Sequence, residues 1–213
     1  MRFAIQSLPF LWQGLLVTLH ISALIVFFSL LAGTILGIGI VYGPRWLYWP
    51  IRLYSDFFRG IPLLVLIFFM YYGLPAFKVN LTNFDSVVLA LSAFESAHII
   101  EVVRGAIQSI PRGQTEAAKS IGLTAWQRLL SVRLPTMFRV VLPSLSNAYV
   151  SLFKDTSLAS VIAVPELTYG AQWIKTNSFR VIETWAVVTP MYLVTGYALL
   201  FALQRLERRF AIH

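Results

Sequence analysis

The chain has 213 residues, 58% of them hydrophobic, and a mean hydropathy of +0.73. A soluble domain of this size cannot bury so much apolar side chain, so part of its solvent must be lipid. The net charge of +8 would suit a nucleic-acid binder, but the basic residues alternate with long apolar runs, as in the loops of a membrane protein. There is no cysteine, and His20, His98 and His213 do not cluster, so we expect no metal site and no nucleic acid.

The first two apolar stretches predict two membrane spans, each of which needs about 20 residues. Residues 15–41 carry no charge, and the apolar run after Arg2 shows no cleavage site, so we expect a retained first span. Residues 61–74 are short and reach spanning length only if their helix begins near Trp49.

The third stretch, residues 87–107, contains the ionisable residues Glu95, His98, Glu101 and Arg104. Such groups are expensive at membrane depth, so this helix should face protein or a wet cavity. Glu95 and His98 are three residues apart and share one helix surface, and Glu101 and Arg104 repeat that spacing.

Two further spans complete an all-α integral membrane protein of about five transmembrane helices. The fourth covers residues 135–152, after which the polar run 154–157 interrupts the apolar pattern before it resumes at 158–164. A broken or re-entrant segment is expected there, because irregular backbone is tolerated at depth only where protein or water satisfies it. The fifth covers about 185–203.

The distribution of basic residues predicts the orientation of these five spans. Five basic residues fall on one side: Arg2, Lys78, Lys154, Lys175 and Arg180. Twelve fall on the other: Arg45, Arg52, Arg59, Arg104, Arg112, Lys119, Arg128, Arg133, Arg139, Arg205, Arg208 and Arg209. The positive-inside rule then places the N-terminus outside and the C-terminus in the cytoplasm.

The cytoplasmic segment 110–134 predicts two short helices joined by a tight corner. Residues 116–119 are strong helix formers, and Gly122 followed by Leu123 suits a left-handed helix end. Thr124 and Gln127 have the spacing of a capping box, and Pro135 suits the first turn of the next helix. Taken alone, the segment could also be an amphipathic hairpin that Trp126 and basic residues hold on the lipid surface.

A resemblance to a known family selects between these interpretations. Glu116-Ala117-Ala118, then Gly122, then Leu134-Pro135 resembles the EAA motif of permease subunits of binding-protein-dependent ABC importers. Further stretches resemble the polar amino acid branch of that family (histidine-, glutamine- and cystine-type permeases): residues 58–64, 71–75, 101–105, 142–143, 154–158 and 165–167.

The resemblance implies the fold of a type I importer permease, with residues 1–213 forming one transmembrane domain in the bacterial inner membrane. It implies that Glu116, Ala117, Ala118, Gly122 and Leu123 dock on an ABC ATPase dimer, which would bind the ATP and Mg²⁺. It also implies a second permease subunit, identical or homologous, an extracytoplasmic solute-binding protein and an amino acid cargo. The chain itself has no catalytic residues and no G-x-x-x-x-G-K-[ST] phosphate loop.

The expected pathway residues are Glu95, His98, Lys154, Asp155 and Ser157. Glu95 and His98 stand where the family usually has small, amide or tyrosine side chains, and Leu66 stands where a glutamine is common. Glu95 and His98 could hydrogen-bond each other, or Glu95 could meet a cargo ammonium group. Lys154 and Asp155 could pair at the helix break or contact cargo, whereas Glu101 and Arg104 are expected to form a structural ion pair.

Two rival functions follow from the same residues. An ion-gradient-driven transporter or channel could use Glu95, Glu101 and Asp155 as a proton or cation relay. A membrane-embedded enzyme using Glu95 and His98 is disfavoured, because no nucleophile or metal-ligand set accompanies them.

Overall fold

The computed structural model describes residues 2–210, which form helices and turns with no β-strand in that range. Met1 and residues 211–213, including His213, lie outside it. The elements run in this order: α1 (Arg2–Tyr42), α2 (Arg45–Gly60), α3 (Leu63–Phe68), η1 (Phe69–Gly73), η2 (Leu74–Phe77), α4 (Asn83–Gln108), α5 (Arg112–Ser120), α6 (Ala125–Arg128), η3 (Leu129–Arg133), α7 (Leu134–Asp155), η4 (Thr156–Ile162), α8 (Leu167–Ser178) and α9 (Val181–Phe210).

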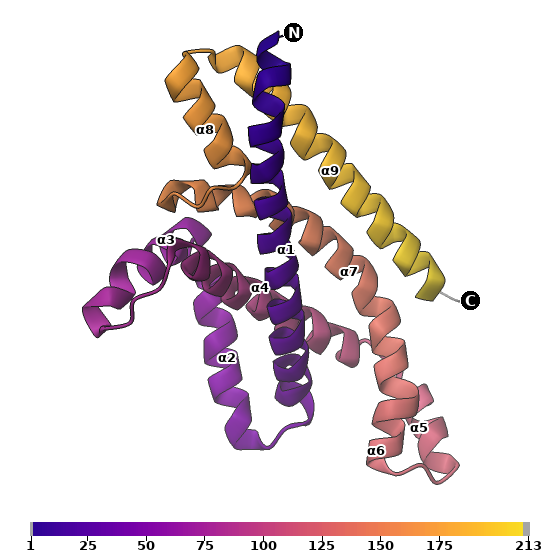
Figure 1. Cartoon of the computed structure of the whole chain (residues 1–213). Coiled ribbons are helices and arrows are strands. Elements are labelled where there is room, and N and C mark those ends of the chain that lie inside the picture. Colours follow the sequence, from indigo (N-terminus) through magenta and orange to yellow (C-terminus); the bar gives the residue numbers. More distant parts are fainter. Residues whose placement is uncertain (1, 211–213) are drawn as a thin grey trace.

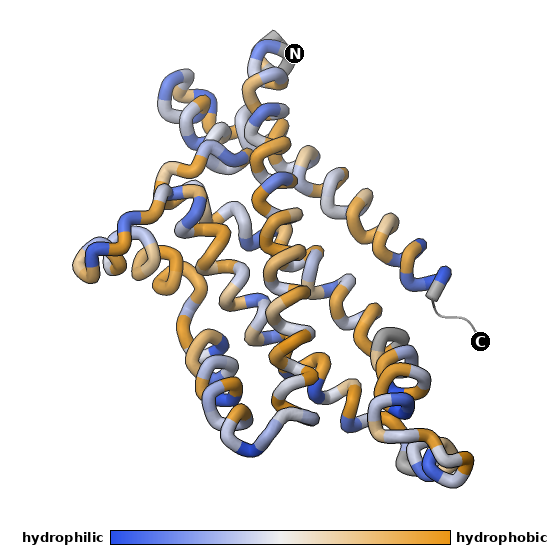
Figure 2. Tube along the Cα trace, turned by 60° about the horizontal axis from the view of Figure 1, so that its bottom comes forward, coloured by the Kyte–Doolittle hydropathy of each residue, from blue (hydrophilic) through white to orange (hydrophobic). Residues whose placement is uncertain are grey.

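The predicted class of fold, an all-α membrane protein, is confirmed. Among the described residues, α1, α4 and α9 are each long and apolar enough to cross a bilayer, and the bent pair α2 and α3 could form a fourth span. The 22-residue helix α7 occupies the place of the remaining expected span. Hydrophobic residues run along these long helices, with hydrophilic residues at the end of α9 (Figure 2).

The first helix is much longer than the expected span of residues 15–41. The 41 residues of α1 extend for about 60 Å at 1.5 Å per residue, roughly twice the thickness of a hydrocarbon core. It runs along most of the molecule, from α8 at one end to the turn before α2 at the other (Figure 1).

The second span is bent, contrary to the prediction of one helix from near Trp49 to residue 74. α2 and α3 meet at 105°. Ile61 between them is extended, with φ −97° and ψ 134°. The ring of Pro62 disfavours a helical backbone at the preceding residue, which explains why the helix ends here.

The predicted break after α7 is present. The chain leaves α7 at Asp155, continues as the 3₁₀ segment η4 and turns at Ala163, which has φ 59°. The next helix, α8, was not predicted from the sequence, because its polar residues conceal its apolar face.

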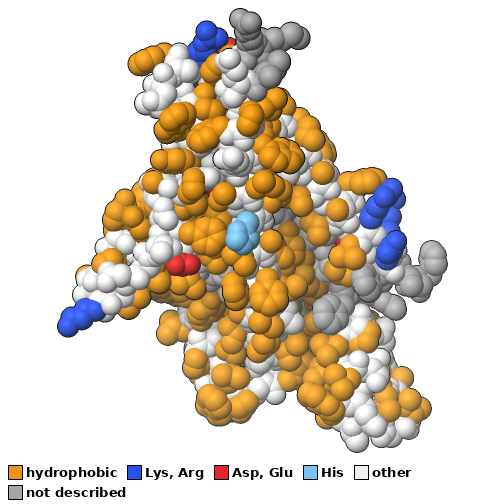
Figure 3. All heavy atoms as spheres, viewed as in Figure 1, with side chains coloured by type: hydrophobic (Ala, Val, Ile, Leu, Met, Phe, Trp, Pro, Cys, Tyr) orange, Lys and Arg blue, Asp and Glu red, His pale blue; other side chains and the backbone are white. Residues whose placement is uncertain are grey.

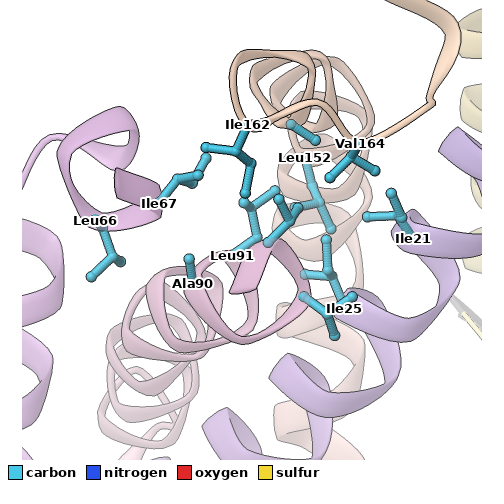
Figure 4. Packing of buried hydrophobic residues seen from close by; sticks show 12 residues of the cluster. Ile21, Ile25, Leu66, Ile67, Ala90, Leu91, Leu152, Ile162 and Val164 are labelled. Carbon is cyan, nitrogen blue, oxygen red and sulfur yellow. The ribbon is translucent and has the colours of Figure 1, made fainter. Parts of the chain in front are cut away.

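The largest core cluster lies where α1, α3, α4, α7 and η4 converge. Figure 4 shows Ile21 and Ile25 of α1 beside Leu91 of α4, with Leu152 and Ile162 on the far side. The face of the molecule drawn in Figure 3 is largely covered by hydrophobic side chains, with Lys and Arg at its margins, as lipid exposure or subunit contact requires.

Candidate functional site

The α5–α6 hairpin (residues 112–128) projects from one end of the molecule, below α7 (Figure 1). Its corner is a Schellman motif. The amide of Gly122 donates to the carbonyl of Lys119 at 3.0 Å, and the amide of Leu123 donates to the carbonyl of Ala118 at 3.2 Å. Gly122 has φ +81°, a conformation in which any Cβ is strained, so the predicted left-handed corner is confirmed.

The second arm of the hairpin begins with the predicted capping box. The amide of Gln127 donates to Thr124 Oγ1 at 3.3 Å, and the amide of Thr124 donates to Gln127 Oε1 at 2.9 Å. Pro135 does lie in the first turn of α7, but no loop or N-cap residue separates α7 from the helical turn before it. The helical run continues from α6 through the π-helical turn η3, which accommodates the missing N–H.

The hairpin offers an exposed surface of mixed character. Of the EAA residues, Glu116 and Ala117 are exposed while Ala118 is buried. Ile121 and Trp126 are 76% and 68% exposed at the corner and on the second arm. Ile121 is not one of the residues that the EAA-like motif singled out. It lies directly before the bend at Gly122, where its side chain is exposed.

Glu95 and His98, expected to be neighbours, turn to different partners. Nδ1 of His98 lies 3.0 Å from the carbonyl of Phe94, and its ring packs on that of Phe94 at 4.6 Å. Glu95 is 94% buried and has no hydrogen-bond partner among the described residues, so the mutual hydrogen bond is not formed. Asp155 and Tyr149 lie within electrostatic range of the Glu95 carboxylate.

The residues at the end of α7 also separate. Lys154 is exposed and lines a cavity of about 260 Å³ between α7 and α9 with Tyr192 and Tyr197. Asp155 is half-buried, and no ion pair within 4 Å joins it to Lys154 in the described part of the chain. Ser157 is half-buried, and its carbonyl accepts from Ser160 Oγ at 2.7 Å. Asp155 therefore lies within electrostatic range of both Glu95 and Lys154, whereas His98 is turned to Phe94.

Glu101 is the centre of an ionic cluster between α2 and α4. Arg104 Nε donates to Glu101 Oε2 at 2.9 Å, and Arg52 Nη1 donates to Glu101 Oε1 at 3.1 Å. Asp56 accepts from Arg52 at 2.8 Å and from Arg59 at 2.9 Å. The expected pair of Glu101 and Arg104 is thus part of a larger network that ties the bent second span to α4.

Glu166 was singled out only as part of a motif, yet it is the best-connected buried carboxylate. It caps α8 by accepting from the amides of Thr168 at 2.8 Å and Tyr169 at 2.7 Å, and it also accepts from Tyr192 at 2.9 Å. Thr18 of α1 donates to it at 3.4 Å. A sequence signal was available, since an acidic residue directly before a helix is a common N-cap.

These features define a polytopic helical membrane protein with an exposed helical hairpin between two of its spans. No group of three or more His, Cys, Asp or Glu able to hold a metal ion occurs among residues 2–210. Residues 29–212 match the family of binding-protein-dependent transport system inner membrane components. The chain belongs to that family, as the EAA-like motif predicted.

Individual relatives and a solved structure agree with this assignment. The chain is 37% identical to the glutamine transport system permease protein GlnP of Escherichia coli K12, over 97% of this chain and 95% of that protein. It is 36% identical to the probable amino-acid ABC transporter permease protein YckA of Bacillus subtilis, over 90% and 84%. It superimposes with a TM-score of 0.90 and 30% identity on a chain from a crystal structure of an amino acid ABC transporter with histidines, covering 96% of each chain.

Proposed function

We propose that this chain is the membrane-spanning subunit of an ATP-driven importer of polar amino acids. The single observation that carries the proposal is the α5–α6 hairpin, whose Schellman corner presents an exposed surface made by Glu116, Ala117, Gly122 and the flanking Ile121. The names of the relatives, which refer to glutamine or other amino acids, support the cargo class.

In this proposal the hairpin is the coupling element, within a single permease domain of residues 1–213 whose coupling loop spans about 110–134. A partner ATPase dimer binds ATP and Mg²⁺, because this sequence contains no phosphate loop to hold them. A second permease subunit completes the pathway, and a binding protein delivers the cargo. The subunit itself is non-catalytic and lies in the bacterial inner membrane, with its N-terminus outside and its C-terminus in the cytoplasm.

The coupling role is tested by Gly122→Asp. The substitution places a Cβ at φ +81°, which opens the corner and shifts the docking surface. We expect the variant to insert in the membrane but to lose co-purification of the ATPase. Gly113→Asp is the matched control, because Gly113 lies in the helical first turn of α5 with open space around it, where an acid is favourable. Equal ATPase recovery with both variants would remove the coupling assignment.

A second proposal concerns the pathway. Glu95 is a buried carboxylate without a hydrogen bond among the described residues and lies within electrostatic range of Asp155, so a cationic group arriving between them would be stabilised by both. We expect cargo to present its ammonium group to this pair. Lys154, exposed at the end of α7, is the candidate for a cargo carboxylate, and Ser157 and His98 are the remaining expected pathway residues.

Glu95→Gln tests the pathway role. Uptake of a panel containing labelled glutamine, histidine and cystine by proteoliposomes should fall, while co-purification of the ATPase and the binding-protein-free ATPase rate stay unchanged. Glu183→Gln, an exposed acid at the start of α9, is the control and should transport normally. A parallel fall in uptake and assembly would show that Glu95 only supports the bundle.

The rival proton or cation relay is less well supported. It requires Glu101 to exchange ions with Glu95 and Asp155, but Glu101 is held by Arg52 and Arg104. Uptake by the isolated chain in vesicles without ATP, driven by an ion gradient, would favour the relay over the importer.

A further inference from the structure

Arg133 connects the α5–α6 hairpin to α1, a helix that is far from it in sequence. The guanidinium donates to Tyr42 Oη at 2.7 Å through Nη1, and to Thr115 Oγ1 at 3.4 Å through both Nε and Nη2. It also lies over the Tyr42 ring, 5.4 Å from the centroid. One side chain from η3 thus contacts the last residue of α1 and the middle of α5.

Little else holds the hairpin to the rest of the molecule at this point. Of the α5 side chains that are described, only Ala118 is buried. Two cavities of about 310 and 510 Å³ flank the contact, and Arg133 lines both. Since close packing is missing on either side, the polar contacts of Arg133 carry the connection to α1.

Beyond this contact, α1 is closely packed on α4. A Cβ built on Gly33 would lie 2.6 Å from Cβ of Ile99, and one on Gly37 would lie 2.7 Å from Cβ of Val103. Small residues four apart allow such close approach of membrane helices. The two helices therefore cannot slide past each other without separating.

In its N-terminal half, α1 is joined to α8 by a second close contact. A Cβ on Gly14 would lie 3.0 Å from Cα of Leu167. The hydroxyl of Thr18 accepts from the amide of Leu167 at 3.1 Å and donates toward Glu166. Tyr192 adds α9 to the same carboxylate, so α1, α8 and α9 meet at Glu166.

We propose that Arg133 is a positioning residue that links the α5–α6 hairpin to α1, and that α1 carries a displacement of the hairpin to the Glu166 junction, where α8 begins. Tyr42 follows Thr18 by 24 positions, so the two contacts are about 36 Å apart along one helix. A continuous hydrogen-bonded helix transmits such a displacement along its axis with little loss. Because α1 and α4 are packed too closely to slide, α1 receives the displacement by two routes, through Arg133 and through α4, which joins the hairpin at residues 109–111.

The inference rests on the proposed function, in which a partner ATPase moves the hairpin, and its test uses the permease assembled with that ATPase in proteoliposomes. The chain contains no cysteine, so Ser178→Cys at the end of α8 provides a single labelling site. We expect its rate of reaction with a membrane-impermeant maleimide to differ by about fivefold or more between the nucleotide-free and vanadate-trapped states. In Arg133→Gln the two rates should differ less, because only the route through α4 remains, although the ATPase still co-purifies and hydrolyses ATP.

Two further variants separate the link from general damage to the hairpin. Tyr42→Leu removes the partner on α1 and leaves the hairpin surface intact, so it should reduce the difference in the same way even if Arg133→Gln fails to assemble. Arg45→Gln, at the start of α2, has no described hydrogen bond to lose and should keep the full difference. A rate difference of undiminished size in Tyr42→Leu, or no difference in the unsubstituted reporter, would overturn the inference. Failure of the ATPase to co-purify with the unsubstituted chain would instead refute the proposed function.

Discussion

The buried carboxylate of Glu166 makes the most quantitative prediction. In Glu166→Gln the amide oxygen can keep the bonds from Thr168 and Tyr192, but the amide nitrogen then faces the backbone N–H of Tyr169. Leaving that buried N–H without an acceptor costs about 1–3 kcal/mol, and loss of an N-cap costs about 0.5–2 kcal/mol. Because both describe the same event, we expect about 2 kcal/mol in total, or roughly 30-fold in the folding equilibrium.

The assay is thermal unfolding of the purified chain in detergent. For a chain of this length, 2 kcal/mol corresponds to a fall in Tm of about 4–8 °C. Tyr192→Phe is the control, since it removes one donor and leaves both backbone amides satisfied, and it should cost about 1 kcal/mol. A Tm for Glu166→Gln within about 1 °C of the unsubstituted protein, or a larger loss in Tyr192→Phe, would refute the reasoning.

Three further predictions concern other contacts. Gly37→Leu must separate α1 from α4 and should destabilise the chain by about 1–3 kcal/mol. Gly105→Ala has open space around the new methyl group and should stabilise the chain by up to about 1 kcal/mol. The Tm of each variant in detergent distinguishes the two effects. Glu101→Gln should cost about 1–3 kcal/mol, because it leaves half-buried Arg104 without a charged partner while Arg52 keeps Asp56, and a Tm that responds less to salt would support this. Thr124→Ala removes the capping box and should raise hydrogen exchange in α6 by about fivefold, equivalent to about 1 kcal/mol, while exchange in α4 stays constant.

Local signals in the sequence were sufficient for the class of fold and for the hairpin. Apolar length defines a span because the bilayer has a nearly constant thickness, and Gly122, Thr124 and Gln127 specify a corner through their own backbone preferences. Neither conclusion depends on distant residues. The EAA-like spacing extended this to the family, which the match over residues 29–212 confirms.

Contacts between distant residues were decided only by the tertiary structure. The spacing of Glu95 and His98 permits a hydrogen bond, but the His98 ring packs on Phe94 and Asp155 of another helix lies within electrostatic range of Glu95. Leu66, which departs from the family pattern, is a core residue of the cluster shown in Figure 4. Periodicity reports which face of a helix is apolar, but it does not report which other helix covers that face.

The same limit applies to Arg133 and Glu166. In the sequence, Arg133 is one of twelve basic residues that indicate a cytoplasmic loop, and Glu166 is one acid before a helix. Their importance comes from partners that are 91 and 148 residues away along the chain, Tyr42 and Thr18. Backbone propensities and membrane thickness act on residues that are neighbours in the chain, so their effects can be predicted from the sequence. The partner of a polar side chain depends instead on how the helices pack.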